Sequence, residues 1–354
     1  MRETTAAHGD GDTGTLDEAL ERLHATGPEF EGWLSNHAPM AVEALVRHGQ
    51  GARVHRWLDD YGDRLEELPG AYGRITSENW RDALGDARHL ADWPVFFAER
   101  IGERPWRDVL AEWWPRLLPG ITASATHPVI RVGHAVRALR EGGETAPRLA
   151  ELAHALGYWA ARHQVLPRDV APLPAPGAPG AALRAVPRVA DPSGGINHRL
   201  GQITALPAWP GGLAGGPEAA EGHLRALVRD AVGHYAAHAH GNPVMLVHAA
   251  TAPNAVLRVL PDLPVELWPA GVAAAWTASA GVVAAYRPDA PRPEPAEGAR
   301  TGAGELFDRA AAHGDEHAIK LVDTALDVAA YAPETAARAY GAGLRAVELI
   351  APLD

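Results

Sequence analysis

The chain has 354 residues, of which 47% are hydrophobic and 21% charged, and its formal net charge is −12. This is a globular composition with room for one large domain or two fused ones, and the acidic balance argues against nucleic acid as a partner. Because the sequence has no cysteine, disulfides and thiolate metal sites are excluded, and any metal would be bound through nitrogen and oxygen.

The sequence shows none of the usual signals for membrane insertion or secretion. No uninterrupted apolar run reaches about 18 residues, and no basic segment followed by an apolar core opens the chain. We therefore expect a cytoplasmic protein that has no membrane partner.

The first residues of the chain are small, polar and rich in glycine, and we expect residues 1–14 to form a disordered tail. Gly9, Gly11 and Gly14 match the spacing G-x-G-x-x-G, but no strand pattern precedes them, so a dinucleotide site is not predicted. From residue 15 onward the apolar residues recur mostly at helical spacing. We interpret residues 15–350 as a single all-helical domain.

The N-terminal half of this domain covers residues 15–165. Leu16, Leu20 and Leu23 belong to a first apolar stripe, and Asn36 is placed to cap the next helix. The prolines near residues 94, 105 and 128 lie close to predicted helix starts, where a missing N–H is harmless. Helices are predicted after the first stripe over about residues 38–48, 52–66, 87–102, 104–117, 128–140 and 146–164.

Residues 166–217 differ in composition, with many prolines and glycines and little periodicity. We expect a long connection, either a lid over a pocket or a plain linker, with room for a short helix near residues 180–185. Helical periodicity returns in the C-terminal half, residues 218–350, over about 218–239, 243–259, 265–286, 301–312, 315–331 and 334–349. The predicted fold class is therefore all-α, an irregular multi-helix bundle with a long Pro/Gly-rich connection between two halves.

Histidines in apolar helical stretches are the strongest candidates for chemistry, because the familiar hydrolase, phosphate-loop and H-E-x-x-H motifs are absent from the sequence. His317 and Lys320 are three residues apart, so they share one face of a helix. His127 and His134 are two turns apart, about 10.5 Å along the axis, so they share a face without meeting at one point. The candidate metal ligands are His37, His127, His134, His248, His317 and Lys320.

Each candidate also has a plain structural interpretation. A single buried histidine is more often a hydrogen-bonded core residue than a ligand, and a lysine such as Lys320 can pack its stem while its ammonium reaches solvent. Imidazoles suit both iron and zinc, so residue type alone leaves the metal open.

Five segments together resemble the questin oxidase-like family, in the right order from about residue 16 to residue 350. The segments are LSNHAPMAVEAL, THPVIRVGHAVRAL, LAHALGYWAARHQ, HAATAPNAVLRVLP and DEHAIKLVDTAL. The resemblance implies an oxidase of aromatic polyketide chemistry, since described relatives in fungi open the central ring of anthraquinones or oxidise related polycyclic phenols.

The resemblance also implies a mononuclear non-haem iron centre held by histidines and by a lysine carboxylated on its amine. The positions that match are the six candidate ligands above, with Lys320 as the carboxylated lysine. Because this set has more imidazoles than a four-histidine site requires, one of His127 and His134 can belong to the substrate pocket instead. Iron(II) is the expected metal and zinc the less favoured one, and dioxygen is the expected co-substrate.

For the substrate, we expect an electron-rich, hydrophobic aromatic small molecule in a pocket lined by tryptophans such as Trp159 and Trp276. Arg131 lies one turn from both His127 and His134, and its expected role is to hold a substrate oxyanion; its alternative role is a salt bridge with a surface carboxylate. The few phenylalanines and the proline-rich insert near residues 166–215 indicate a pocket that differs from that of the anthraquinone-cleaving relatives.

Two other functions remain open on the sequence. One is a metal-free Baeyer–Villiger-type oxidase that depends on NADPH, for which the sequence offers no credible nucleotide fingerprint. The other is a non-enzymatic helical protein that binds a hydrophobic metabolite and needs no metal.

Overall fold

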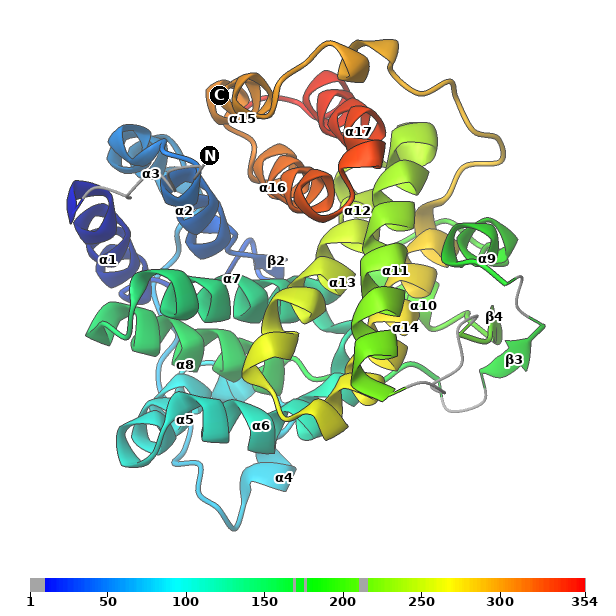
Figure 1. Ribbon diagram of the computed structural model, residues 1–354. Helices are drawn as coiled ribbons and strands as arrows, with labels where there is room; N and C mark the ends of the chain where they lie inside the picture. The colour runs from blue at the N-terminus through cyan, green and yellow to red at the C-terminus, as the bar shows by residue number, and fades with distance from the viewer. Residues whose placement is uncertain (1–9, 168–169, 175–176, 210–215, 354) are drawn as a thin grey trace.

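The computed structural model describes residues 10–167, 170–174, 177–209 and 216–353, and helices make up most of them (Figure 1). The all-α class predicted from the apolar periodicity is confirmed. The helices are α1 Asp10–His24, α2 Ala38–Arg47, α3 Val54–Asp60, α4 Trp80–Ala83, α5 Asp92–Glu103, α6 Trp106–Leu117, α7 His127–Gly142, α8 Ala146–Ala161, α9 Pro179–Ala185, α10 Ile196–Leu200, α11 Gly216–His238, α12 Pro243–Leu246, α13 His248–Val259, α14 Trp268–Tyr286, α15 Ala303–His313, α16 Glu316–Tyr331 and α17 Ala336–Leu349.

The N-terminal segment differs from the predicted tail. Helix α1 begins at Asp10 and so includes residues 10–14 of the predicted tail, whereas residues 1–9 lie outside the described residues. Leu16, Leu20 and Leu23 are buried, and α1 packs on α2 and α8. Once that packing has formed the helix, adding a turn at its start costs little, because propagation is far easier than nucleation.

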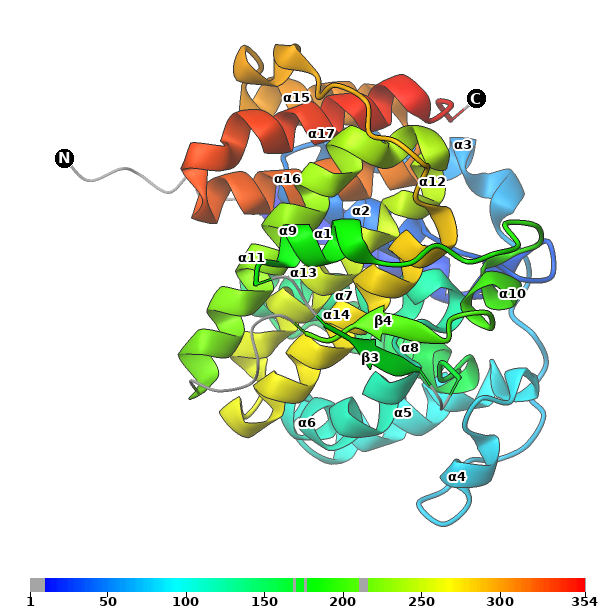
Figure 2. The same cartoon turned by 90° about the vertical axis from the view of Figure 1, so that its right-hand side faces the viewer.

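The Pro/Gly-rich connection contains more regular structure than its composition suggested. The predicted short helix is present as α9, and α10 follows it. Strand β3 (Ala171–Leu173) pairs in parallel with β4 (Ala205–Pro207), with Ala171 opposite Ala205. In Figure 2 these elements face the viewer, and both α9 and α10 pack on α14. A second short pair, β1 (Glu29–Phe30) and β2 (Leu34–Ser35), is antiparallel and precedes α2.

Two apolar cores hold the helices together. The larger core lies among α5–α8, α11, α13 and α14, and the smaller core joins α1–α3 to α15 and α16. Helix α13 occupies the middle of the molecule and contacts α7, α11, α14 and α16 (Figures 1 and 2). Helices α2 and α16 lie between the two cores, and this position brings segments from both ends of the chain to one place.

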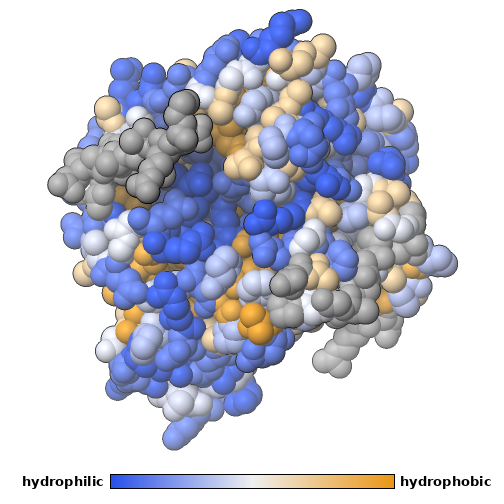
Figure 3. All heavy atoms as spheres, viewed as in Figure 1, coloured by the Kyte–Doolittle hydropathy of each residue, from blue (hydrophilic) through white to orange (hydrophobic). Residues whose placement is uncertain are grey.

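Two segments, Pro243–Asp262 and Val265–Tyr286, are long and apolar enough to cross a membrane by composition. In the folded chain 78% and 61% of their most apolar stretches are buried against other elements, as in core helices. The face shown in Figure 3 is mainly hydrophilic, with apolar residues in small separate groups.

Candidate metal centre

Four histidines from distant parts of the chain stand at the starts of four helices. They are His37, which immediately precedes α2; His127, the first residue of α7; His248, the first residue of α13; and His317, the second residue of α16. The four helices form a ring in which α2 contacts α7, α7 contacts α13, α13 contacts α16, and α16 contacts α2. The ring places its four N-terminal ends together, and we call these histidines the four-histidine cluster.

The imidazoles of the cluster are close enough to share one ion. One ring nitrogen from each histidine lies within 4.8 Å of those of the other three. The Nε2 atom of His127 is 2.7 Å from Nε2 of His37 and 2.8 Å from Nε2 of His248. All four residues are buried, with exposed fractions between 0% and 7%. Imidazole nitrogens that converge on one point suit first-row transition metals such as iron, copper, nickel and zinc.

Two of the histidines are held in the tautomer that a metal needs. The Nδ1–H group of His127 donates to the carbonyl of Ser124 at 2.5 Å, and that of His248 donates to the carbonyl of Met245 at 3.1 Å. With the proton on Nδ1, the Nε2 atom keeps its lone pair and points it into the cluster.

The turn before His127 has an unusual backbone. Ser124, Ala125 and Thr126 have φ angles of 41°, 56° and 69°, which is the left-handed region that side chains other than glycine rarely adopt. This turn aims the Ser124 carbonyl at His127 Nδ1, so local strain is used to orient a ring of the cluster.

Lys320 lies one helical turn beyond His317 on α16 and belongs to the same site. Its side chain is 1% exposed, and its Nζ atom has no hydrogen-bond partner. Burial lowers the pKa of Lys320 to about 7, although Glu316 and Asp315 oppose the shift. Near neutral pH a large share of Lys320 is therefore an uncharged, nucleophilic amine.

The electrostatics of the cluster favour neutral imidazoles. Burial lowers the pKa values of His37, His127 and His248, and the nearby Lys320 lowers them further. Each helix N-terminus also contributes a partial positive charge of about half a unit. A divalent cation at this point would need an anionic ligand to offset that potential, and an ammonium on Lys320 would oppose its binding.

His127 belongs to the four-histidine cluster, whereas His134 does not. Its Nδ1 atom lies 2.6 Å from a carboxylate oxygen of Glu43, and Arg258 donates to its Nε2 atom at 3.3 Å. Both ring nitrogens of His134 therefore have protein partners. The physical reason for its position is the helix rise, since two turns of α7 carry His134 away from the N-terminal ends where the four-histidine cluster lies.

Arg131 forms a salt bridge with a carboxylate, which was the alternative role expected for it. It is 4% exposed and forms two hydrogen bonds to Glu151, at 2.6 and 2.8 Å. Glu151 is itself buried, so the partner is an interior carboxylate rather than the surface one expected. This pairing occupies the Nε and Nη2 donors of Arg131, and its role in holding a substrate oxyanion stays a prediction.

The two tryptophans expected in the pocket are core residues. Trp159 is fully buried and donates to the Gly120 carbonyl, and Trp276 is 4% exposed and donates to the Pro207 carbonyl. Their indole N–H groups are satisfied by backbone, as buried tryptophans require, so neither presents a polar group to a substrate.

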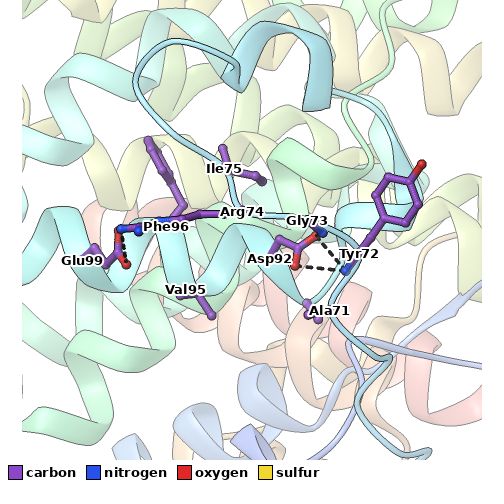
Figure 4. Close-up of a pocket in the computed structure, with 10 residues that line it drawn as sticks. Ala71, Tyr72, Gly73, Arg74, Ile75, Asp92, Val95, Phe96 and Glu99 are labelled. Atoms are coloured by element: carbon purple, nitrogen blue, oxygen red, sulfur yellow. Dashed lines mark hydrogen bonds and ion pairs between the residues drawn. The ribbon is translucent and has the colours of Figure 1, made fainter.

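The surface hollow drawn in Figure 4 lies away from the four-histidine cluster. It has a volume of about 380 Å³ and is formed by the loop around Tyr72 and by α5. There Asp92 accepts from the backbone of Tyr72 and Gly73, and Arg74 pairs with Glu99. None of its lining residues belongs to the four-histidine cluster.

Sequence reasoning missed the residues that surround His37 and His317. Glu316 and Tyr61 lie against these two histidines, and Arg64 pairs with Glu316. The acidic dipeptide directly before His317 was a visible signal for Glu316, but Tyr61 and Arg64 sit in a polar turn that carries no motif.

The comparisons with known proteins agree with the resemblance over part of the chain. The questin oxidase-like family model matches residues 34–159, which contain His37 and His127 but not His248, His317 or Lys320. No curated protein matches the chain. The match supports an oxidoreductase, and the buried four-histidine cluster is a group that could hold a metal ion. Over residues 34–159, about a third of its length, the chain is similar to the questin oxidase-like family.

Proposed function

We propose that the chain is a non-haem iron oxygenase that oxidises, and ring-cleaves, a polycyclic aromatic or polyketide-type substrate with dioxygen. One observation carries the proposal: four buried imidazoles converge beside a buried lysine amine that has no partner. The site would hold iron(II) through the four-histidine cluster and through Lys320. When bound, iron would supply the one-electron chemistry that lets dioxygen react with an aromatic ring.

Carboxylation of Lys320 would explain why a lysine lies beside a metal site. The uncharged amine adds to carbon dioxide, a C–N bond forms, one proton is released, and the product is a carbamate anion. Its oxygens extend further from α16 than the amine does. The carbamate is an anionic ligand, and its charge would offset the partial positive charges of the converging helix N-termini.

The burial of the ligands indicates the direction from which a substrate approaches. His248 and Lys320 are 0% and 1% exposed, whereas His37, His127 and His317 are 5–7% exposed. The small residual exposure of these residues therefore lies on the side where α2, α7 and α16 begin. We infer that an aromatic substrate enters there, while the closed side formed by α13 keeps water away from the ligands.

The experiment is elemental analysis of protein purified without oxygen. The unaltered chain is expected to contain near-stoichiometric iron, and the variants Lys320→Ala and His248→Ala are expected to contain little. The matched control is His55→Ala, since the side chain of His55 is 52% exposed and lies outside the cluster. Unchanged iron content in both ligand variants would contradict the proposed site.

Activity assays separate the proposal from the other two functions. Dioxygen uptake with electron-rich polycyclic phenols is expected to stop after chelation and to return with iron(II). An oxidation that needs NADPH and survives exhaustive chelation would instead support the metal-free oxidase. Binding of an aromatic ligand with equal affinity by His248→Ala and by the unaltered chain, without metal in either, would support a binding protein.

A further inference from the structure

Glu316 lies between two histidines of the cluster. It is the first residue of α16 and is 2% exposed. Its Oε1 atom is 3.7 Å from Nδ1 of His37 and 3.7 Å from Nδ1 of His317. One buried carboxylate oxygen therefore faces two rings that come from opposite ends of the chain.

The two rings beside Glu316 lack the support that the other two have. His127 and His248 each use Nδ1 to bind a backbone carbonyl. The Nδ1 atoms of His37 and His317 are buried, and neither has a hydrogen-bond partner. A buried polar atom without a partner is costly. Metal binding through Nε2 would place the proton of each ring on Nδ1, and each of these two nitrogens would then need an acceptor.

Asp315 is a poorer candidate for that acceptor. Its Oδ1 atom is 3.6 Å from Nδ1 of His317, but the same oxygen already accepts from the backbone N–H groups of His317 and Ala318 as the cap of α16. Glu316 is the carboxylate that both histidines share.

Arg64 holds the Glu316 carboxylate from the outside. Its Nη1 atom donates to both carboxylate oxygens at 3.1 Å, and its side chain is 37% exposed. In the same turn, the hydroxyl of Tyr61 accepts the backbone N–H of His37 at 3.1 Å. The turn that follows α3 thus contacts both His37 and the carboxylate of Glu316.

We propose that Glu316, held in place by Arg64, is a positioning residue that orients His37 and His317 for metal binding and keeps the proton of each ring on Nδ1. The inference rests on the proposed metal centre. The distance from Glu316 Oε1 to each Nδ1 atom is 3.7 Å, which is longer than the hydrogen-bond range of about 2.7–3.2 Å. A small movement of each ring toward Glu316 would complete both hydrogen bonds. A carboxylate behind a ligand histidine orients the ring and strengthens it as a donor to the metal.

The test uses cobalt(II) as a spectroscopic probe, titrated without oxygen into the full-length, metal-stripped chain. Glu316→Gln is expected to weaken cobalt binding by about 10- to 100-fold and to shift the ligand-field absorption bands. Arg64→Met is expected to cause a smaller loss of the same sign, and Arg64→Lys to restore part of it. The control is Arg74→Met, which removes an arginine from an exposed pair with Glu99 and is expected to change nothing.

The melting temperature of each metal-stripped protein separates positioning from a merely structural effect. The Glu316→Gln protein is expected to keep its melting temperature within a few degrees while its cobalt spectrum changes. Unchanged cobalt affinity and spectrum in Glu316→Gln would overturn the inference and leave the proposed function intact. Failure of the unaltered chain to bind cobalt(II) or iron(II) would overturn both.

Discussion

At the scale of single residues, His127 depends on a strained backbone. Three consecutive non-glycine residues, Ser124, Ala125 and Thr126, are left-handed, and each such residue costs about 1–2 kcal/mol. The turn persists because its surroundings hold it, including the hydrogen bond from His127 to the Ser124 carbonyl. Strain of this kind next to a candidate ligand is typical of functional sites, whose geometry the surrounding fold sets in advance.

Substitutions at Ala125 test this strain. Ala125→Gly is expected to change the free energy of unfolding by less than about 1 kcal/mol, because glycine relieves the left-handed strain but adds freedom to the unfolded chain. Ala125→Val is expected to destabilise by about 2 kcal/mol or more, because a β-branched side chain is poorly accommodated there. Urea unfolding of the two metal-free variants measures both effects. Equal stability of the two proteins would contradict a left-handed turn at this position.

At the scale of elements, the contact between α7 and α13 sets the distance between His127 and His248. Gly133 lies at this contact, and a Cβ atom there would come within 2.6 Å of the Ala255 Cβ and 2.7 Å of its Cα. Neither atom can move without moving the helix. The close approach of the two helices therefore requires glycine at position 133.

The pair Gly133→Ala and Gly222→Ala tests the close approach, since both glycines are inside helices. Gly133→Ala is expected to destabilise the protein by about 1–3 kcal/mol through overpacking and to weaken metal binding by moving His127 away from His248. Gly222 is exposed on α11, and a Cβ atom added there would meet nothing within 4 Å, so Gly222→Ala is expected to stabilise by about 0.5–1 kcal/mol. Thermal unfolding and cobalt titration measure the two effects. A stabilising Gly133→Ala would refute the packing argument.

The same four helices also share a buried layer of ion pairs about two turns beyond the histidines. Arg137 of α7 bonds Glu43 of α2 at 2.8 Å and Asp323 of α16 at 2.9 and 3.0 Å. Arg258 of α13 bonds Asp323 at 2.6 Å. Burial would raise the pKa of Asp323, but the two arginines outweigh it and hold that pKa well below its ordinary value. These ion pairs fix the positions of the four helices relative to one another along their axes.

Removal of one charge from this layer is expected to destabilise the folded protein strongly. Arg137→Met leaves Glu43 and Asp323 buried without their shared partner, and it is expected to destabilise the protein by about 3–5 kcal/mol. Arg74→Met, in an exposed ion pair, is expected to cost less than about 1 kcal/mol. Urea unfolding compares the two variants. Similar small losses in both would show that the buried layer does not hold the helices in register.

At the scale of the whole molecule, several buried histidines make the fold sensitive to acid. His234 on α11 is 6% exposed, its Nε2 atom has no partner, and its ring stacks on His238 at 4.0 Å. Burial lowers the pKa of His234 to about 3. Between pH 3 and the ordinary value near 6.5, the unfolded chain binds a proton at this position and the folded chain does not. The contribution of His234 to stability is therefore present above about pH 6.5 and is lost as the pH falls toward about 3.

The variant His234→Phe isolates this effect. Between pH 6 and pH 4 the unaltered protein is expected to lose about 1.4 kcal/mol more per pH unit than the variant, which is the effect of one proton. Urea titrations of the metal-free proteins at several pH values measure the two slopes. Parallel slopes would mean that His234 is protonated equally in the folded and unfolded chains.

The sequence by itself determined the helices and most of the candidate ligands. Apolar periodicity depends on local spacing alone, so α2, α11, α16 and α17 lie close to their predicted ranges. The resemblance carried by the histidine-containing segments pointed to an oxidase with a metal site, and the family match supports an oxidoreductase. His317 and Lys320 could be placed together from sequence because three residues on a helix fix their relation.

Only the tertiary structure decided which imidazoles meet. His127 and His134 are equivalent by spacing, and the convergence of four helix starts selects His127. The same packing pairs Arg131 with Glu151 and brings Glu316 and Arg64 to the cluster. These contacts join residues separated by 20 to more than 250 positions. They depend on how whole helices pack, which no local pattern encodes.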